Sequence, residues 1–407
     1  MGMTLKLAFR NLWRNRRRTL ITAASVMFAT FFAISMSSIQ KGTWQNTIEG
    51  ILHNYTGYIQ IHAKGYWENQ SIDRLFMNRP GLVDSIRSLP EIDKVMERLE
   101  NFALVSTGPK TKGVLIAGVI PEQVEQFSGI QNQVVSGTFM EDGMEEAVLG
   151  EDLAELLGLT VHDTLIAISQ GYRGNNAVGQ YKITGFVDFG NPQFNKQLVY
   201  IPLSQAHDFY AAPGLISSLV LTTRNISDTE DAVQKIETML DTNRYEIMDY
   251  QELLPTLIEG QALDEASSKI IMYILYILIG FGMLGTVMMM LKERQYEFGV
   301  LKAIGMKSRY LFSMVFTEVL AMGILGVLAG IVLALPLVLY FQYNPIHLGA
   351  GYAETYEQFN MEPLMKAVVS PGVFIEQAIV VFIMVALISL YPYFNLRNMK
   401  PVEAMRA

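Results

Sequence analysis

Four long apolar stretches set the broad organisation of this chain of 407 residues. A helix needs about 20 mostly apolar residues to cross the hydrocarbon core of a bilayer. Stretches that meet this requirement cover residues 19–39, 270–291, 310–341 and 372–394. The first two contain no charged residue, the third contains only Glu318 and the fourth only Glu376. The sequence therefore predicts a membrane protein with four transmembrane α-helices.

Residues 40–269 instead show the mixed polar and apolar pattern of a folded soluble domain. Strict alternation over residues 57–62 predicts a half-buried strand. Similar patterns predict strands at residues 114–119, 146–149, 165–169, 181–188, 198–201, 216–223 and 245–248. Helices are predicted at residues 82–89, 151–157 and 229–240. The domain is therefore expected to be α+β, with a strand-rich centre at about 101–200 as a second lobe.

Charge is distributed unevenly between these parts. The whole chain carries −8, whereas residues 40–269 hold 16 basic and 31 acidic residues, a net charge of −15. Nucleic-acid binding needs a basic surface, so the acidic domain argues against it. Basic residues gather beside the spans, in residues 1–18, 292–309 and 395–407, and Lys366 is the only one in residues 342–370. The positive-inside rule then predicts that both termini and the loop at 292–309 are cytoplasmic, and that residues 40–269 and 342–371 face outward.

The first 18 residues predict a helix that lies along the cytoplasmic membrane surface. Apolar residues recur there at helical spacing, and basic residues occupy another face. The apolar positions are Leu5, Ala8, Phe9, Leu12 and Trp13, and the basic ones are Lys6, Arg10, Arg14 and Arg17. A plain basic flank is the alternative. The apolar run after it is longer than that of a cleaved signal peptide, so we expect a retained membrane anchor.

Signatures of catalysis are missing from the sequence. There is no cysteine, no His-Glu-x-x-His and no Gly-x-Ser-x-Gly, and the histidines are scattered. The acidic run at residues 141–146 lacks the spacing of a calcium loop. No Gly-Lys dipeptide occurs, which excludes a P-loop. We therefore expect a non-enzymatic chain with no metal or cofactor of its own, and any ATP that drives it would be bound by a partner subunit.

The cytoplasmic loop at residues 292–309 predicts a short helix that ends near Gly305. Glu293 and Glu297 are four residues apart and are expected to share one face. Phe298, Leu301 and Ile304 are expected to form an apolar stripe on another. Such a helix can dock into a groove on a soluble partner. A loop that contacts only lipid is equally compatible with the pattern.

The third span contains a carboxylate and a run of small residues. An ionisable group inside a membrane is costly and indicates a function or a specific partner, and a position near the headgroups is the alternative for Glu318. Gly323, Gly326 and Gly330 follow it. Small residues at this spacing allow helices to approach closely. They predict helix packing within the chain or a seam between two chains.

These segments resemble the FtsX/MacB-type permeases of ABC transporters. The resemblance lies in residues 293–306 (ERQYEFGVLKAIGM), in Phe316–Val319 with the glycines after it, in the tail YP…PVEAMR, in the opening LAFRNL…RRR, and in the outer SGTF…VLGE. In size and layout the chain is most similar to the lipoprotein-release (LolC/LolE-type) permeases, and residues 57–62 resemble a segment of that group.

The resemblance implies a porter-like lobe with an inserted β-rich lobe, two permease chains side by side, and an ABC ATPase subunit on the cytoplasmic face. It implies a bacterial inner-membrane transporter that releases lipoproteins, with lipids as neighbours. The residues that it assigns to the ATPase contact are Glu293, Arg294, Glu297, Gly299, Lys302, Ala303 and Gly305. A subunit that transmits motion to an efflux partner or an envelope hydrolase is the first alternative. A membrane-anchored sensor without an ATPase is the second.

Overall fold

The computed structural model describes residues 16–79, 81–108, 110–349, 351, 364–400 and 404. The chain divides into two compact units. The helical unit comprises Met1–Trp44, Gly260–His347 and Leu364–Ala407, and the αβ unit comprises Gln45–Glu259 and Leu348–Pro363. Most of the surface helix predicted at residues 1–18 lies outside the described residues. Residues 16–18 form the start of a long helix instead.

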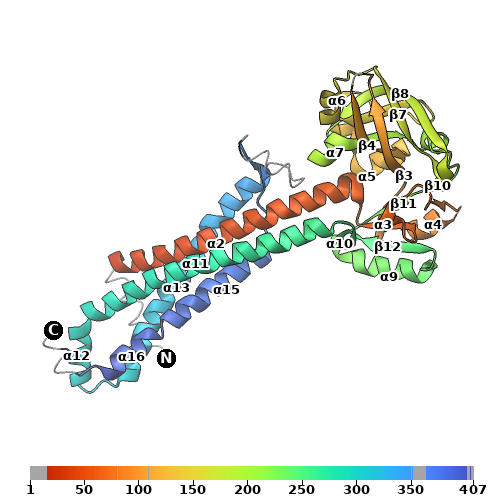
Figure 1. Ribbon diagram of the computed structural model, residues 1–407. Coiled ribbons are helices and arrows are strands. Elements are labelled where there is room, and N and C mark those ends of the chain that lie inside the picture. Colours follow the sequence, from red (N-terminus) through yellow and green to blue (C-terminus); the bar gives the residue numbers. More distant parts are fainter. Residues whose placement is uncertain are drawn as a thin grey trace. The chain divides into compact units, whose positions relative to one another are not determined.

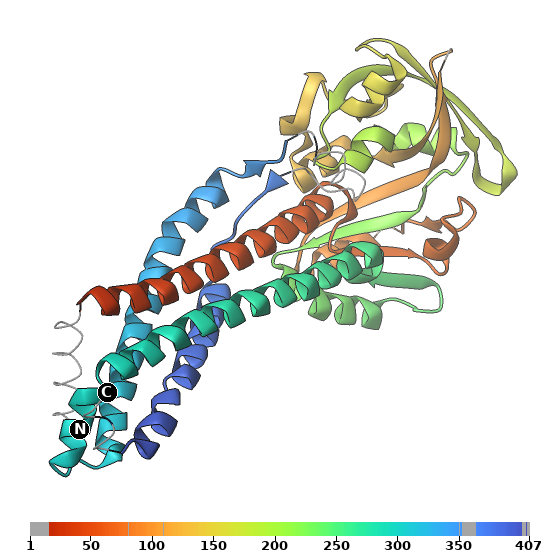
Figure 2. The same cartoon turned by 60° about the vertical axis from the view of Figure 1, so that its left-hand side comes forward.

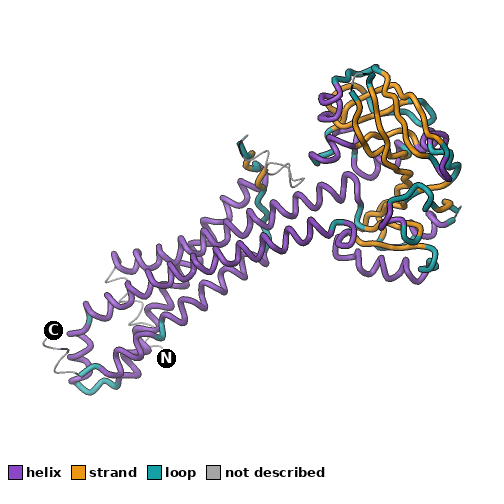
Figure 3. Tube along the Cα trace, viewed as in Figure 1, coloured by secondary structure: helices purple, strands orange, loops and turns teal. Residues whose placement is uncertain are grey.

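Long helices dominate the helical unit (Figures 1 and 3). Its elements are α2 (Arg16–Ile51), α11 (Pro255–Glu293), α12 (Gln295–Ala303), α13 (Ser308–Tyr343), α15 (Pro371–Ile388), α16 (Tyr391–Asn398), β13 (Ile346–His347) and β14 (Leu364–Met365). Four helical segments are long and apolar enough to cross a membrane, which confirms the predicted number of apolar helices among the described residues. The first three of these helices, α2, α11 and α13, are longer than the apolar stretches because polar residues at their ends continue the helical hydrogen bonding.

The fourth apolar stretch is not one helix, as predicted for residues 372–394, but two. α15 ends at Ile388, and α16 begins at Tyr391 with Pro392 in its first turn. Proline has no backbone N–H and cannot donate to the carbonyl four residues before it. The chain therefore breaks between the two helices, where Ser389 N–H still donates to Val385 O over 2.9 Å.

An extended segment after β14 packs between α2 and α13 in the helical unit. Val368 N–H donates to Ser38 O over 3.1 Å, and Ala367 N–H donates to Phe341 O over 3.3 Å. A Cβ on Gly42 would lie 2.4 Å from Lys366 O, so only glycine allows this approach. Part of the loop predicted at residues 342–371 is thus ordered backbone held against helices. Residues 350 and 352–363 lie outside the described part.

The αβ unit is built on one mixed sheet, whose strands are visible in Figure 2. Its strands are β1 (Ile59–Ala63), β3 (Ile92–Ser106), β4 (Thr111–Val119), β5 (Val134–Gly137), β6 (Glu146–Gly150), β7 (Thr164–Gln170), β8 (Asn176–Val187), β9 (Leu198–Pro202), β11 (Ser218–Thr223) and β12 (Tyr245–Asp249). The order is β12-β1-β11-β3-β4-β9-β6-β8-β5, and β7 pairs with β3 and β8. β2 (Phe76–Met77) and β10 (Leu215–Ile216) form a separate small ladder.

Short helices cover this sheet and complete three apolar cores. They are α3 (Tyr66–Asn69), α4 (Leu82–Arg87), α5 (Pro121–Ser128), α6 (Glu151–Leu157), α7 (Pro192–Gln197), α8 (Leu203–Phe209), α9 (Thr229–Met239) and α10 (Tyr250–Leu253), with the short turns η1 (Leu52–Thr56), η2 (Ile130–Gln133), η3 (Tyr172–Gly174) and η4 (Ile226–Asp228). Each strand and helix predicted for this domain is present, and the α+β class is confirmed.

The longest strand, β3, was not predicted. Its sequence carries five charged residues, which hide the apolar pattern of a central strand. It pairs with β11 through its first half and with β7 through Leu104–Ser106. The strand-rich segment at about 101–200 is therefore not joined by a flexible link, because β3 belongs to both parts of the sheet.

Candidate functional site

A bend at Arg294 positions the loop at residues 292–309, which holds the predicted site. α11 ends at Glu293 and α12 begins at Gln295, and Arg294 between them has φ −101° and ψ 8°, outside the helical region. Glu293 and Glu297 therefore belong to two helices, and the prediction that they share one helical face is wrong. Because of the bend, a new helix begins at Gln295. The faces of α12 therefore differ from those expected for one helix that begins at residue 293.

Arg294 pairs with Glu318, the carboxylate of the third apolar stretch. Its Nη1 donates to Glu318 Oε2 over 2.7 Å, and its Nε donates to Glu297 Oε2 over 3.2 Å. The guanidinium also lies 5.0 Å from the centroid of the Phe298 ring. Arg294 is 6% exposed and Glu318 1% exposed, so both charges are withdrawn from solvent. The two charges compensate each other, which explains how a carboxylate is tolerated in α13.

The inner face of α12 is anchored to its own chain. Phe298 is fully buried in the core of the helical unit, and Gly299 is buried beside it. Lys302 Nζ donates to Leu396 O over 3.2 Å and to Met399 O over 2.6 Å. A cation at these carbonyls is favourable because the C-terminal end of α16 leaves them without helical partners.

The predicted contact residues therefore fall into two groups. Arg294, Gly299 and Lys302 face inward and position α12, whereas the remaining four are exposed: Glu293, Glu297, Ala303 and Gly305. The expected stripe of Phe298, Leu301 and Ile304 is also wrong. Phe298 is buried and Leu301 is half-buried, so the predicted face packs against the bundle.

A different apolar stripe of α12 is accessible. Tyr296 is 60% exposed and Ile304 is 80% exposed, with Val300 half-buried and Ala303 exposed between them. These positions are four, three and one residues apart, so they share one helical face. We call them the α12 stripe. The spacing of these four residues can be read from the sequence. The bend at Arg294, which turns this face outward, could not be predicted from it.

The three glycines of α13 allow close contacts within the chain. A Cβ on Gly323 would lie 2.3 Å from Val385 Cγ1 of α15. On Gly326 and Gly330 it would lie 2.6 Å from the Cβ atoms of Val26 and Thr30 in α2. The face that carries Gly326 and Gly330 is therefore occupied by α2 of the same chain.

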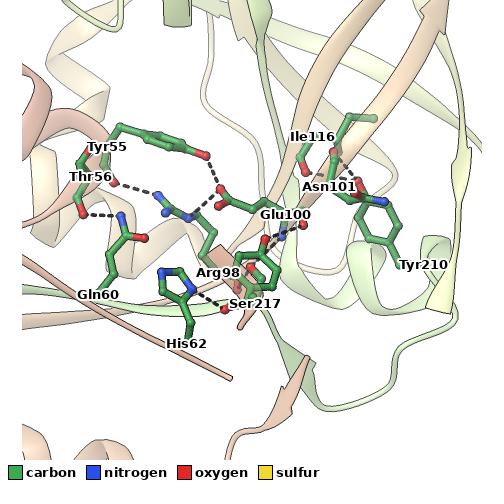
Figure 4. Close-up of polar contacts among 11 residues, drawn as sticks. Tyr55, Thr56, Gln60, His62, Arg98, Glu100, Asn101, Ile116, Tyr210 and Ser217 are labelled. Carbon is green, nitrogen blue, oxygen red and sulfur yellow. Dashed lines mark hydrogen bonds and ion pairs between the residues drawn. The ribbon is translucent and has the colours of Figure 1, made fainter. Parts of the chain in front are cut away.

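A buried ionic cluster lies in the αβ unit, where the π-helical turn η1 follows α2 (Figure 4). Arg98 Nη1 donates to Tyr55 O over 2.8 Å, and the guanidinium lies 4.1 Å from the centroid of the Tyr55 ring. Arg98 Nε lies 3.0 Å from a Glu100 carboxylate oxygen, which also accepts the Tyr55 hydroxyl. Sequence reasoning missed this cluster because its members come from η1 and from β3, which was not predicted.

Polar side chains from β1 and η1 extend the cluster. Gln60 Nε2 donates to Thr56 O over 2.7 Å. His62 Nδ1 lies 2.9 Å from Ser217 O, which assigns the proton to Nδ1 because a carbonyl only accepts. Burial lowers the pKa of the His62 ring, so the ring is neutral near neutral pH. The cluster holds one turn in place and lacks the exposed, activated groups of a catalytic centre.

A second part of η1 contacts the strand-rich segment. Asn54 Nδ2 donates to Phe189 O over 2.9 Å, and Gln133 Nε2 donates to Asn54 Oδ1 over 3.1 Å. The turn is thus tied to β1, to β3 and to residues after β8. No group of three possible metal ligands occurs among the described residues.

Two protein families match the chain. The MacB-like periplasmic core domain matches residues 19–239, and the FtsX-like permease C-terminal domain matches residues 269–401. The first match alone covers more than half of the 407 residues. The chain belongs to the MacB/FtsX family of permeases. This confirms the resemblance to FtsX/MacB-type permeases, whereas the closer similarity to lipoprotein-release permeases stays a prediction.

Curated relatives of this MacB/FtsX-type permease share low identity over most of it. The pyoverdine export ATP-binding/permease protein PvdT of Pseudomonas entomophila (strain L48) is 22% identical over 362 residues, which cover 81% of this chain and 51% of the relative. The macrolide export ATP-binding/permease protein MacB of Escherichia coli is 20% identical over 343 residues, which cover 81% and 52%. The chain spans about half the length of the curated relatives it matches.

Solved structures that are similar to part of this chain include two extracytoplasmic domains. The periplasmic region of MacB from Actinobacillus actinomycetemcomitans aligns with a TM-score of 0.36 at 14% identity, and covers 52% of this chain and 95% of that one. The extracellular domain of the noncanonic ABC-type transporter YknZ from Gram-positive bacteria aligns with a TM-score of 0.35 at 12% identity, and covers 47% and 100%.

Proposed function

We propose that this chain is the permease of an ATP-driven transporter in the bacterial inner membrane, and that its ATP is bound by a P-loop protein outside these 407 residues. The observation that carries the proposal is the α12 stripe. It presents an exposed apolar face from a helix whose opposite face is fixed in the bundle. An exposed apolar stripe on a helix suits a groove on a soluble partner.

The contacts that fix α12 in the bundle make it suitable for transmitting a mechanical force from a partner. The Arg294–Glu318 ion pair connects it to α13, and the bonds from Lys302 connect it to the end of α16. A force applied to the stripe therefore reaches two membrane helices without a flexible joint. Glu293, Glu297, Ala303 and Gly305 provide the remaining contact surface in this proposal, and Arg294, Gly299 and Lys302 position it.

The orientation and assembly follow from the charge pattern and the family. The basic residues beside α12 support a cytoplasmic position for α12 and both termini, and an outward position for residues 40–269. With the α2 side of α13 occupied, a second permease chain would pair through another face. This chain then acts without catalysis of its own, and its neighbours are an ATPase, a second permease and lipids.

The substrate class has two candidates. Lipoprotein release follows from the segment at residues 57–62 that resembles lipoprotein-release permeases. Export of small molecules is favoured by the names of the relatives, which describe pyoverdine and macrolide export. Depletion of the chain distinguishes them: lipoproteins left in the inner membrane support release, and normal lipoprotein sorting contradicts it.

The ATPase contact is tested by affinity purification of the full chain from the cells that encode it. A P-loop ATPase should co-purify, and the complex should hydrolyse ATP. Ile304→Asp and Tyr296→Asp should each reduce the amount of bound ATPase several-fold, because a carboxylate in the apolar contact is desolvated without a partner. Neither change should lower the thermal unfolding temperature, since both side chains are exposed.

The same substitution at Ile226, an exposed isoleucine of η4 in the αβ unit, is the matched control and should leave the ATPase bound. Full ATPase association in both α12 variants would contradict the contact. Absence of any P-loop ATPase from the purified wild-type chain would instead support the sensor alternative.

A further inference from the structure

Two arginines lie beside one aromatic contact between α13 and α16 in the helical unit. The rings of Phe312 and Tyr393 meet edge to face, with their centroids 5.5 Å apart. Arg309 lies three residues before Phe312 in α13, and Arg397 lies four residues after Tyr393 in α16. At these spacings each arginine shares a helical face with its ring. We call these four residues the two-arginine site.

Both arginines lie on the same side of this contact, toward the end of the bundle that carries α12. α13 begins there at Ser308, directly after α12. The end of α16 lies beside α12, because Lys302 donates to Leu396 O and to Met399 O. Figure 1 shows α12 and α16 at the same end of the helical unit. One helical turn rises about 5.4 Å, so each arginine lies about one turn nearer this end than its ring.

Neither guanidinium is neutralised by a carboxylate within the part of the chain that the structure describes. Arg309 Nη2 donates to the Tyr310 hydroxyl over 3.2 Å, and Arg397 Nη1 donates to the Tyr393 hydroxyl over 3.5 Å. Both arginines are exposed. A tyrosine hydroxyl carries no charge, and a guanidinium has five N–H donors. Both groups therefore keep their full charge and most of their donors for an anion.

Acidic residues are absent from the two sequence segments that form the site. Residues 298–317 and 377–402 contain no aspartate or glutamate. The carboxylates of Glu297 and Glu318, at the two ends of the first segment, both contact Arg294. Glu318 is also 1% exposed, so it does not reach the surface of the bundle. The site is therefore positive, and these neighbouring carboxylates already have a partner.

Exposed apolar side chains continue from the site along α16. Leu390 and Phe394 are 45% and 68% exposed. Leu390, Phe394 and Arg397 are four and three residues apart, so they share one face of the helix. An outward face that is apolar for one turn and basic in the next is typical of the boundary between acyl chains and headgroups. This pattern favours a position of Arg397 at the level of the lipid phosphates.

We propose that the two-arginine site binds the phosphate of an anionic phospholipid headgroup. The planar guanidinium matches the geometry of phosphate, and basic pockets between membrane helices bind such headgroups. A carboxylate of a soluble partner offers the same charge, but it does not account for the exposed apolar face that continues from Arg397. A phosphate held by both arginines bridges the start of α13 and the end of α16, the two helices that anchor α12. The inference goes beyond the transport proposal and needs no ATPase.

The test measures which lipid the purified full chain retains. The chain is delipidated in detergent without an ATPase, incubated with equimolar phosphatidylglycerol and phosphatidylcholine, and analysed by native mass spectrometry. We expect phosphatidylglycerol to be retained in preference, because phosphatidylcholine has the same phosphate but no net charge. Arg309→Gln and Arg397→Gln should each lower the retention of phosphatidylglycerol about fivefold.

Matched variants separate a specific site from general attraction between charges. Arg87→Gln and Arg224→Gln remove exposed arginines of the αβ unit and should leave lipid retention unchanged. Arg309→Lys with Arg397→Lys keeps both charges and should retain more phosphatidylglycerol than the double glutamine variant.

Several outcomes would overturn the proposal. They are no retained phosphatidylglycerol, equal retention of both lipids, and an equal loss in the Arg87→Gln and Arg224→Gln variants. Unchanged retention in the double glutamine variant would also overturn it. Loss of a co-purifying ATPase from that variant would then assign the two arginines to a soluble partner.

Discussion

Arg294 and Glu318 are 24 residues apart in sequence and form one buried ion pair, with Nη1 and Oε2 separated by 2.7 Å. The arginine lies at the bend between two helices, and the glutamate lies within α13. Each side chain gives the other a counter-charge that solvent does not supply. The pair therefore fixes the direction in which α12 leaves the bundle.

Removing one member of this pair should cost far more than removing both. Arg294→Met removes this counter-charge from the buried Glu318 carboxylate and should lower the free energy of unfolding by about 3–5 kcal/mol. Glu318→Leu should also be costly, but less so, because Arg294 keeps its ion pair with the exposed Glu297. The double variant Arg294→Met with Glu318→Leu should recover most of that loss. Thermal unfolding of the full chain in detergent measures all three. A double variant as unstable as the sum of the singles would show that the pair does not act as a unit.

Close packing of α13 against α2 predicts a strong size limit at Gly330. A Cβ there would lie 2.6 Å from Thr30 Cβ, so Gly330→Ala forces the helices apart and should destabilise by about 1–3 kcal/mol. Gly282→Ala in α11 is the control, because an added Cβ has no described atom within 4 Å. That change should be neutral or stabilising by up to about 1 kcal/mol. Equal unfolding temperatures for the two variants would contradict the packing.

The hydroxyl of Tyr55 is expected to act through Glu100. Tyr55→Phe removes a donor to a buried carboxylate and should destabilise the αβ unit by about 1.5–3 kcal/mol. In a Glu100→Gln background, the same change should cost less than half as much, because a neutral amide accepts more weakly than a carboxylate. A double-mutant cycle followed by tyrosine fluorescence or circular dichroism measures the coupling. A coupling energy of zero would show that the Tyr55 hydroxyl does not act through Glu100.

Burial of His62 predicts that acid weakens the αβ unit. The folded-state pKa of this ring is lowered, so the unfolded chain binds more protons below the ordinary histidine pKa of about 6.5. Stability present above that pH is lost as the pH falls toward the folded-state pKa. His62→Gln keeps a donor for Ser217 O and should flatten the drop in unfolding temperature between pH 7.5 and 5.5. His53→Gln, at an exposed position of η1, should leave that drop unchanged.

Hydropathy and alternation were enough to predict the four apolar helices and most of the strands, because burial in lipid or in a core leaves a regular pattern in sequence. They failed where charges are buried. Arg98 and Glu100 made β3 look like surface sequence, although they compensate each other in the interior. The accessible face of α12 was also assigned wrongly, because its rotation depends on Glu318, which is distant in sequence. Contacts between residues that are distant in sequence determine the structure, but they leave no periodic pattern in the local sequence.

The π-helical turn η1 has a consequence for how this region can vary. Each hydrogen bond in such a turn closes around one more residue than in an α-helix, as Gly57 N–H does with Leu52 O over 2.8 Å. One residue of helix corresponds to a rotation of about 100°. Deleting a residue between 52 and 56 would therefore swing Tyr55 away from Arg98, or Asn54 away from Phe189. The exposed His53 can be replaced by another residue type. The length of residues 52–56 cannot change, because β1, β3 and the residues after β8 each contact the turn at one angular position.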